Sequence, residues 1–345
     1  MLRKYSFIIM LLFGSVACAQ ENWMVKGYVK GMTSMQTVED NGEMSLENTL
    51  HNRFDINWYA NENLTVTVGM RNRVIIGNNV SLIPDYADYV SRDSGFLDLS
   101  WVWADQTSWI GVSQLDRLMV DYTAGNLQVT LGRQRINWGQ TFAWNPNDLF
   151  NTYSYFDFDY EEKPGSDALR LQYYIGESSK LELSTALNAD QEVTSVMLYR
   201  FNTGGYDLQF LGGVFTGSDY VLGGGFSGSI AGGGFSGEFT YFHPMDDQDN
   251  DGGGRATATL HYDYTFQSSL NLQFEALYNG FGADDFANGI GDIVFQDLSP
   301  KNLFPTKLAF LGSGGYDVSP LFRVMLAGMY GPEGNFLYLG PTLNY

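Results

Sequence analysis

The sequence contains little cysteine, histidine or positive charge. Cys18 is the single cysteine in 345 residues, and three histidines and 19 lysines and arginines stand against 39 acidic residues. One cysteine excludes a disulfide-stapled scaffold, and so few thiols and imidazoles disfavour a transition-metal site. A formal net charge of −20 argues against nucleic-acid binding, because such proteins neutralise phosphates with a basic surface. The 15% of aromatic residues argues against disorder.

Long apolar runs are also scarce. The longest apolar run lies at the N-terminus. Arg3 and Lys4 precede an apolar run over residues 5–16 and the small residues around Cys18. This order predicts a secretory signal peptide over 1–19. Two alternatives remain: a lipoprotein signal acylated at Cys18, disfavoured by Ser15, and a retained anchor, for which the run is too short. No later stretch is long enough to cross a bilayer as a helix.

The remaining chain alternates polar and apolar residues with a period of two. In residues 255–266 one face carries Arg, Thr, His and Asp, and the other carries Ala, Leu, Tyr and Phe. Successive strand residues point to opposite faces, so each such segment has one wet and one apolar face. Many segments reach the ~10 residues that a tilted membrane strand needs, with aromatic residues near their ends. A soluble sandwich, which also alternates, is the competing interpretation.

The alternation predicts an all-β protein over residues 20–345, a transmembrane antiparallel up-and-down β-barrel of about 16 strands. The expected strands are 22–38, 43–60, 63–77, 114–124, 127–138, 165–177, 179–190, 193–204, 206–217, 219–231, 232–245, 253–267, 268–282, 304–316, 319–331 and 334–345. Long connections fall on one side and short ones on the other, as in bacterial barrels. The strand-like segment Phe96–Ala104 is placed in the second outer loop, because another wall strand would break this parity.

Two motifs carry a resemblance to known proteins. Residues 132–151 read Gly-Arg-Gln-Arg-Ile-Asn-Trp-Gly and onward to Asn151, and the last strand alternates to the terminal aromatic Tyr345. The first segment resembles the Gly-Arg-Gln…Trp-Gly segment of porin-like outer-membrane proteins, and the second resembles the assembly signal of Gram-negative outer-membrane barrels. The resemblance implies passage of solutes and insertion by the barrel-assembly machinery. It assigns no functional residue.

A barrel of about 16 strands leaves an aqueous lumen, and the strands contain arginines that such a lumen would solvate. These candidate pore-lining residues are Arg53, Arg71, Arg73, Arg117, Arg133, Arg135, Arg170 and Arg200. Arg133 and Arg135 alternate in step with the apolar residues Val129 and Leu131, which are expected to face lipid. A bulge at Gly132 would turn the two arginines inward, and without it they would face lipid or lie at the rim.

The third expected outer loop is acidic. Its candidate constriction residues are Asp148, Asp157, Asp159, Glu161 and Glu162. In position and charge this loop resembles the inward-folded third loop of general porins, which faces a basic wall. Carboxylates opposite guanidinium groups would create a transverse field that sets ion preference. The alternative is ordinary ion pairing within a surface loop.

Three further features give weaker hypotheses. Asp247, Asp249 and Asp251 have the spacing of a calcium loop but lack its bidentate glutamate, so calcium is a weak expectation and no other cofactor is expected. His261 and Asp263 share a face near Ser268 and Ser269, a sparse basis for a hydrolase. Trp109, Trp138 and Trp144 are expected to anchor the membrane interface, with stacking on sugars as the alternative.

The sequence therefore predicts a channel of the bacterial outer membrane that passes small hydrophilic solutes and is not an enzyme. Lipid, lipopolysaccharide and the assembly machinery are its expected partners, and the sequence gives no oligomeric state. The second hypothesis is a non-conducting barrel that serves as a surface interaction or assembly component. An outer-membrane hydrolase is the third.

Overall fold

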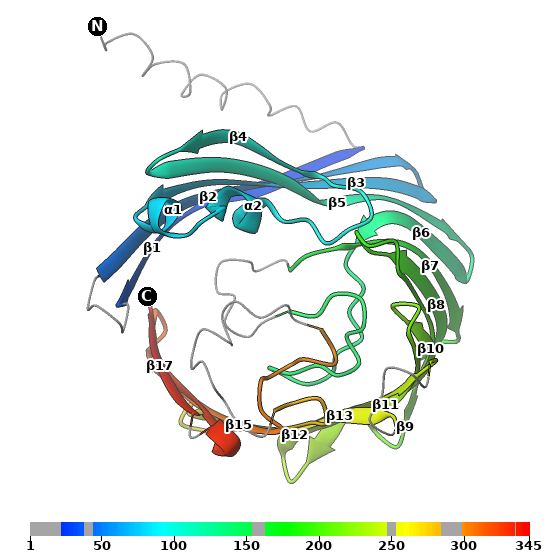
Figure 1. Ribbon diagram of the computed structural model, residues 1–345. Coiled ribbons are helices and arrows are strands. Elements are labelled where there is room, and N and C mark those ends of the chain that lie inside the picture. The colour runs from blue at the N-terminus through cyan, green and yellow to red at the C-terminus, as the bar shows by residue number, and fades with distance from the viewer. Residues whose placement is uncertain (1–21, 38–43, 154–162, 247–252, 284–298, 335) are drawn as a thin grey trace, which may run out of the picture. The chain divides into compact units, whose positions relative to one another are not determined.

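The computed structural model describes residues 22–37, 44–153, 163–246, 253–283, 299–334 and 336–345. It divides the chain into two compact units: unit 1 contains 1–93 and 99–124, and unit 2 contains 94–98 and 125–345. The described residues form 17 strands (Figure 1), and neighbouring strands pair antiparallel. The expected signal peptide over 1–19 and the calcium loop at Asp247, Asp249 and Asp251 lie outside the described residues.

Unit 1 is built on four long strands and one short strand. Its elements are β1 Trp23–Thr37, β2 Met44–Asn61, β3 Leu64–Gly77, α1 Asn79–Leu82, α2 Tyr86–Ser91, β4 Ser100–Gln106 and β5 Trp109–Ala124. β1 pairs with β2, β2 with β3, and β3 with β5. Tyr86 of α2 packs with Ile75 and Ile110, so the two short helices cover one end of this sheet.

Unit 2 is a meander in which each strand pairs with the next along the chain. Its strands are β6 Leu127–Gln134, β7 Ser166–Ile175, β8 Ser179–Leu187, β9 Val193–Thr203, β10 Tyr206–Phe215, β11 Asp219–Ile230, β12 Gly233–Pro244, β13 Arg255–Thr265, β14 Asn271–Asn279, β15 Leu308–Ser319, β16 Phe322–Gly331 and β17 Phe336–Asn344, with a 3₁₀ turn η3 at Pro332–Gly334. Figure 1 shows this sheet curved, with the segment after β6 on its concave side.

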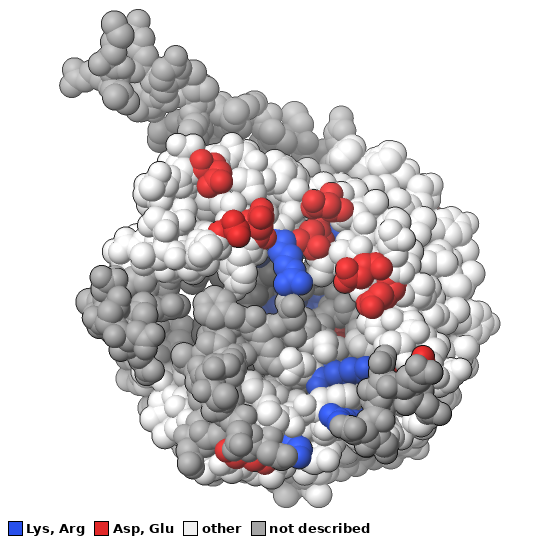
Figure 2. Space-filling model, viewed as in Figure 1, with Lys and Arg blue, Asp and Glu red and all other residues white. Residues whose placement is uncertain are grey.

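The strands bury their polar face and expose their apolar face. On β13, Thr257 and Thr259 are buried while Leu260 is 48% exposed, and on β14 Glu275 is fully buried while Phe274 is 51% exposed. In the view of Figure 2 the outer margin of the strands carries almost no charge. Monomeric soluble proteins rarely expose so much contiguous apolar surface, so this pattern indicates an apolar environment outside the sheet.

The fold confirms the predicted all-β, antiparallel, up-and-down class and corrects it in one place. Each of the sixteen expected strands is present, with bounds shifted by a few residues. The segment Phe96–Ala104, placed in a loop by parity, contributes to the additional strand β4. β4 forms a hairpin with the start of β5, and Val102 stands opposite Val112. β5 begins at Trp109 rather than at residue 114, because residues 109–114 pair with β4 on one side and with β3 on the other.

Candidate functional site

The segment that follows β6 folds back onto the polar face of unit 2. Residues Ala143 to Leu149 are buried, although they belong to neither a strand nor a helix. A buried irregular segment needs partners for its backbone N–H groups. Two glutamates of the sheet accept most of these N–H groups, so the segment Gln140–Asn147, here called the inner loop, is fixed to the strands that it covers.

Glu238 on β12 holds both ends of the inner loop. Its Oε1 accepts the backbone N–H groups of Gln140 and Thr141, the latter at 2.9 Å, and its Oε2 accepts that of Asn147 at 2.9 Å. The Thr141 hydroxyl also donates to Oε1 at 3.2 Å. Asn147 in turn donates its side-chain amide to the Gly224 carbonyl. The Glu238 carboxylate thereby holds the first and last residues of the inner loop close together.

Glu275 on β14 holds the middle of the inner loop. It accepts the N–H groups of Phe142 at 2.8 Å, Ala143 at 3.1 Å and Trp144 at 2.8 Å. Nδ1 of His261, directly opposite on β13, lies 3.1 Å from the second oxygen of Glu275. Hydrogen bonds to a carboxylate are stronger than neutral ones, so the three bonds from Phe142, Ala143 and Trp144 to Glu275 fix three successive loop residues.

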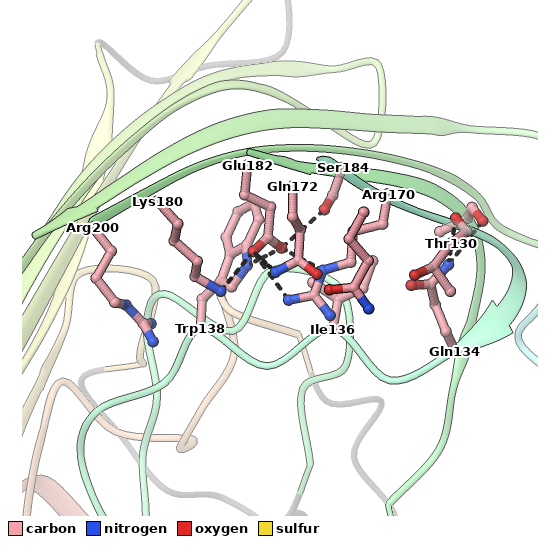
Figure 3. A network of polar contacts seen from close by, with 12 residues as sticks. Thr130, Gln134, Ile136, Trp138, Arg170, Gln172, Lys180, Glu182, Ser184 and Arg200 are labelled. Atoms are coloured by element: carbon pink, nitrogen blue, oxygen red, sulfur yellow. Dashed lines mark hydrogen bonds and ion pairs between the residues drawn. The ribbon is translucent and has the colours of Figure 1, made fainter. Parts of the chain in front are cut away.

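A third carboxylate, Glu182 on β8, collects donors around the start of the loop (Figure 3). Trp138 Nε1 donates to Glu182 at 2.7 Å, and Arg170 binds it through two bonds of 2.7 and 3.0 Å. Lys180 and Gln172 each donate at 3.0 Å. Figure 3 shows these side chains converging from β7, β8 and the loop. The network joins the loop to a basic part of the sheet.

Aromatic packing completes the loop and corrects the interface interpretation. Trp138 packs edge-to-face on Phe150 with 5.0 Å between centroids, and Trp144 packs likewise on Phe304 at 5.8 Å. Both tryptophans are almost fully buried, so neither is a membrane-interface anchor, and neither presents a face to a sugar. Trp109 lies 6.1 Å from the Trp103 ring in the β4–β5 hairpin.

Four of the candidate pore-lining arginines lie in unit 1. Arg53 stands directly opposite Arg71 across β2 and β3. Asp55 and Asp116 bind Arg53, the latter at 2.6 Å. Arg73 donates to the Val90 carbonyl, and Arg117 donates to the Asp116 carbonyl. The register therefore places Arg53, Arg71, Arg73 and Arg117 in neighbouring rows of one sheet face.

The other four lie in unit 2. Arg170 binds Glu182, and Arg200 donates to Gln209 at 2.6 Å. Arg133 binds Asp167 at 2.8 Å and the Leu97 carbonyl, and Arg135 lies 5.3 Å above the Tyr153 ring.

The β6–β7 register runs through Gly132 without a shift, so this pairing contains no bulge at the predicted position. Gly132 instead has a φ of 114°. Arg133, at the end of β6, is buried and forms an ion pair with Asp167.

Among the candidate constriction residues, only Asp148 belongs to the described part of the chain. Asp157, Asp159, Glu161 and Glu162 lie outside it. Asp148 is buried beside the inner loop. Burial raises its pKa well above the ordinary value, and the positive charge of Arg135 opposes this only in part. Among the described residues of this loop, Asp148 is therefore the one acidic residue that could contribute to a transverse field, and its side chain is buried.

Replacing Asp148 by asparagine should stabilise the fold at neutral pH. A carboxyl whose pKa is raised on folding favours the folded state below its unfolded pKa of ~3.9 and loses that contribution as pH rises through its folded pKa. Asp148→Asn should therefore match the parent protein near pH 3.5 and exceed its free energy of unfolding by about 1–3 kcal/mol at pH 8. Urea unfolding at the two pH values measures this. Equal stability at pH 8 would contradict it.

The remaining candidates that belong to the described part of the chain form no recognisable catalytic or metal centre. Among the described residues no group of three His, Cys, Asp or Glu side chains could hold a metal ion. Ser268 and Ser269 lie in the turn after β13. The His261 imidazole contacts Glu275 and Asp263, the latter at 3.5 Å. Ser236 stands opposite His261 in the register, and none of the described hydrogen bonds joins a serine to this imidazole.

Within the described part of the chain, no helix has both the length and the apolar character needed to traverse a bilayer. No protein-family model and no curated protein matches the chain. Solved structures do: OmpF of Salmonella typhi, in complex with daunomycin, aligns over 94% of this chain and 97% of its own, with 8% identity and a TM-score of 0.53. A mutant porin of Rhodopseudomonas blastica aligns over 93% and 99%, with 10% identity and a TM-score of 0.47. The OmpF alignment shows that this chain has a porin-like fold.

Proposed function

We propose that the protein is a porin-like channel of the bacterial outer membrane through which small hydrophilic solutes diffuse passively. The observation that carries this proposal is the inverted side-chain distribution: apolar side chains face outward, while carboxylates, guanidinium groups and a hydrogen-bonded loop occupy the other face. A sheet of this kind suits lipid on one side and water on the other. The porin-like fold is consistent with it.

The finer parts of the proposal concern export, partners and selectivity. The signal peptide over 1–19 would direct export, and lipid, lipopolysaccharide and the barrel-assembly machinery would be the partners in the membrane. The Gly-Arg-Gln…Trp-Gly segment at 132–139 would mark a porin-like group. An arginine-lined wall would face the acidic third loop. Within unit 1, Arg53, Arg71, Arg73 and Arg117 share one sheet face, which is consistent with such a wall.

Planar-bilayer recording tests the channel directly. The purified protein should give steady conductance, and the double variant Arg71→Ala with Arg73→Ala should move the reversal potential in a salt gradient toward cations, because two positive charges leave the lumen. Arg323→Ala is the matched control, since Arg323 pairs with Asp317 at an exposed strand end. Unchanged selectivity in the double variant would remove the arginine wall from the proposal. A protein without any conductance would instead be a non-conducting surface component.

A further inference from the structure

A small cavity in unit 2 lies beside the segment that follows the inner loop. Its volume is about 190 Å³. Residues 149–152 and 164–166 form one side, and the end of β8, the start of β9, the end of β10 and Ser299–Pro300 form the other. Ser94 and Gly95 contribute the remaining edge. Pockets for drug-sized ligands have ~300–1,000 Å³, so this cavity suits a solute of about one sugar ring.

The lining is polar but almost uncharged. Its hydrogen-bonding side chains include Ser94, Asn151, Thr152, Ser166, Asn188 and Thr194, and among its described lining residues Glu192 alone carries a charge. The rings of Phe150, Phe215, Pro164 and Pro300 also line it. Neutral hydroxyl and amide groups suit a ligand rich in hydroxyls, while flat apolar rings suit its C–H faces. None of the described residues that line the cavity is a lysine or an arginine.

The polar groups are held in place before any ligand arrives. Asn151 accepts the Ile136 N–H at 2.7 Å and donates to Ser166 at 2.8 Å. Asn188 donates to Glu192 at 2.8 Å and accepts the Glu192 N–H at 2.8 Å. Thr194 accepts the Thr216 N–H at 3.1 Å, which leaves its own hydroxyl proton available to a ligand. Such preorganisation reduces the entropy lost on binding.

We propose that this cavity is a binding site for a neutral, polyhydroxylated solute of about monosaccharide size. Its interpretation as a subsite for a permeating solute rests on the proposed channel function, whereas the binding itself does not. The strand ends that form it lie at the same edge of unit 2 as the ends of β6 and β12. Sequence parity assigns this edge to the outer loops, so the site would receive solutes from outside the cell.

Saturation-transfer NMR on the detergent-solubilised protein tests the site with four probes of similar size. Glucose should bind more tightly than glucuronate, glucosamine and cyclohexanol. The double variant Ser94→Ala with Thr194→Val should weaken glucose binding about tenfold, since each lost hydrogen bond is worth a few-fold in affinity. The matched control, Ser178→Ala with Thr257→Val, changes the same residue types outside the cavity and should stay within twofold.

The alternative outcomes overturn the proposal in distinguishable ways. Preferred binding of glucosamine that Glu192→Gln abolishes would make this a cation site, and equal binding of cyclohexanol would make it an apolar one. Absence of glucose binding would exclude the site altogether. Conductance of the same preparation separates the two proposals: binding without conductance contradicts the channel, and conductance without binding contradicts only the site.

Discussion

Replacing Glu275 by alanine should detach the inner loop from the sheet. Glu275 is fully buried and accepts three successive backbone N–H groups, those of Phe142, Ala143 and Trp144. Each buried donor left without an acceptor costs ~1–3 kcal/mol. The three together should lower the free energy of loop opening by on the order of 4 kcal/mol, which corresponds to about a thousandfold faster exchange of these amides. Hydrogen exchange read by mass spectrometry on peptides spanning 139–152 measures this.

Two variants show whether the effect belongs to the carboxylate. Glu275→Gln keeps one acceptor oxygen and should give an intermediate exchange rate, whereas Glu177→Ala, in an exposed turn, should change nothing. If the inner loop also narrows a lumen, Glu275→Ala should increase single-channel conductance. Protection of residues 142–144 that is equal in the parent and in Glu275→Ala would contradict the role assigned to this glutamate.

The fold could be predicted from the sequence because its signal is local. Alternation along each strand decides which face a side chain occupies, and that rule placed all sixteen expected strands. β4 was not predicted as a strand, because the rule that long and short connections alternate applies only to strands that pair along their whole length. β4 pairs with only the first part of β5. A short hairpin added to a wall strand leaves the alternation of its neighbours unchanged.

The sequence predicted where the inner loop lies in the chain, but not the contacts that hold it against the sheet. Glu238 and Glu275 reach loop residues 91 to 133 positions away in the chain. Parity places both glutamates on the polar face, but it does not say that their partners are backbone N–H groups rather than arginines or water. Such long-range contacts leave no periodic trace in the sequence. The tryptophans show the same limit, since a residue near a strand end can turn toward lipid or under a loop.

Replacing Glu182 by alanine should destabilise unit 2 more than any single arginine variant on this face. Glu182 is fully buried and is the shared acceptor of Trp138, Arg170 and Lys180. Its removal leaves two cations close together, with side chains only 18% and 20% exposed. Breaking a buried ion pair on one side costs ~3–5 kcal/mol. We expect a loss of that size in urea unfolding from lipid vesicles at fixed salt.

The triple variant Glu182→Leu, Arg170→Met and Lys180→Met separates the value of the network from the penalty of an uncompensated charge. Apolar replacement of a complete buried ion pair is often neutral or stabilising, so the triple variant should recover most of the loss caused by Glu182→Ala. Trp138 would still lack its acceptor, which should leave a deficit of about 1 kcal/mol. If the triple variant is as unstable as the single one, the network itself stabilises the sheet. If Glu182→Ala costs less than about 1 kcal/mol, water already solvates Arg170 and Lys180, and the loop is held by Glu238 and Glu275 alone.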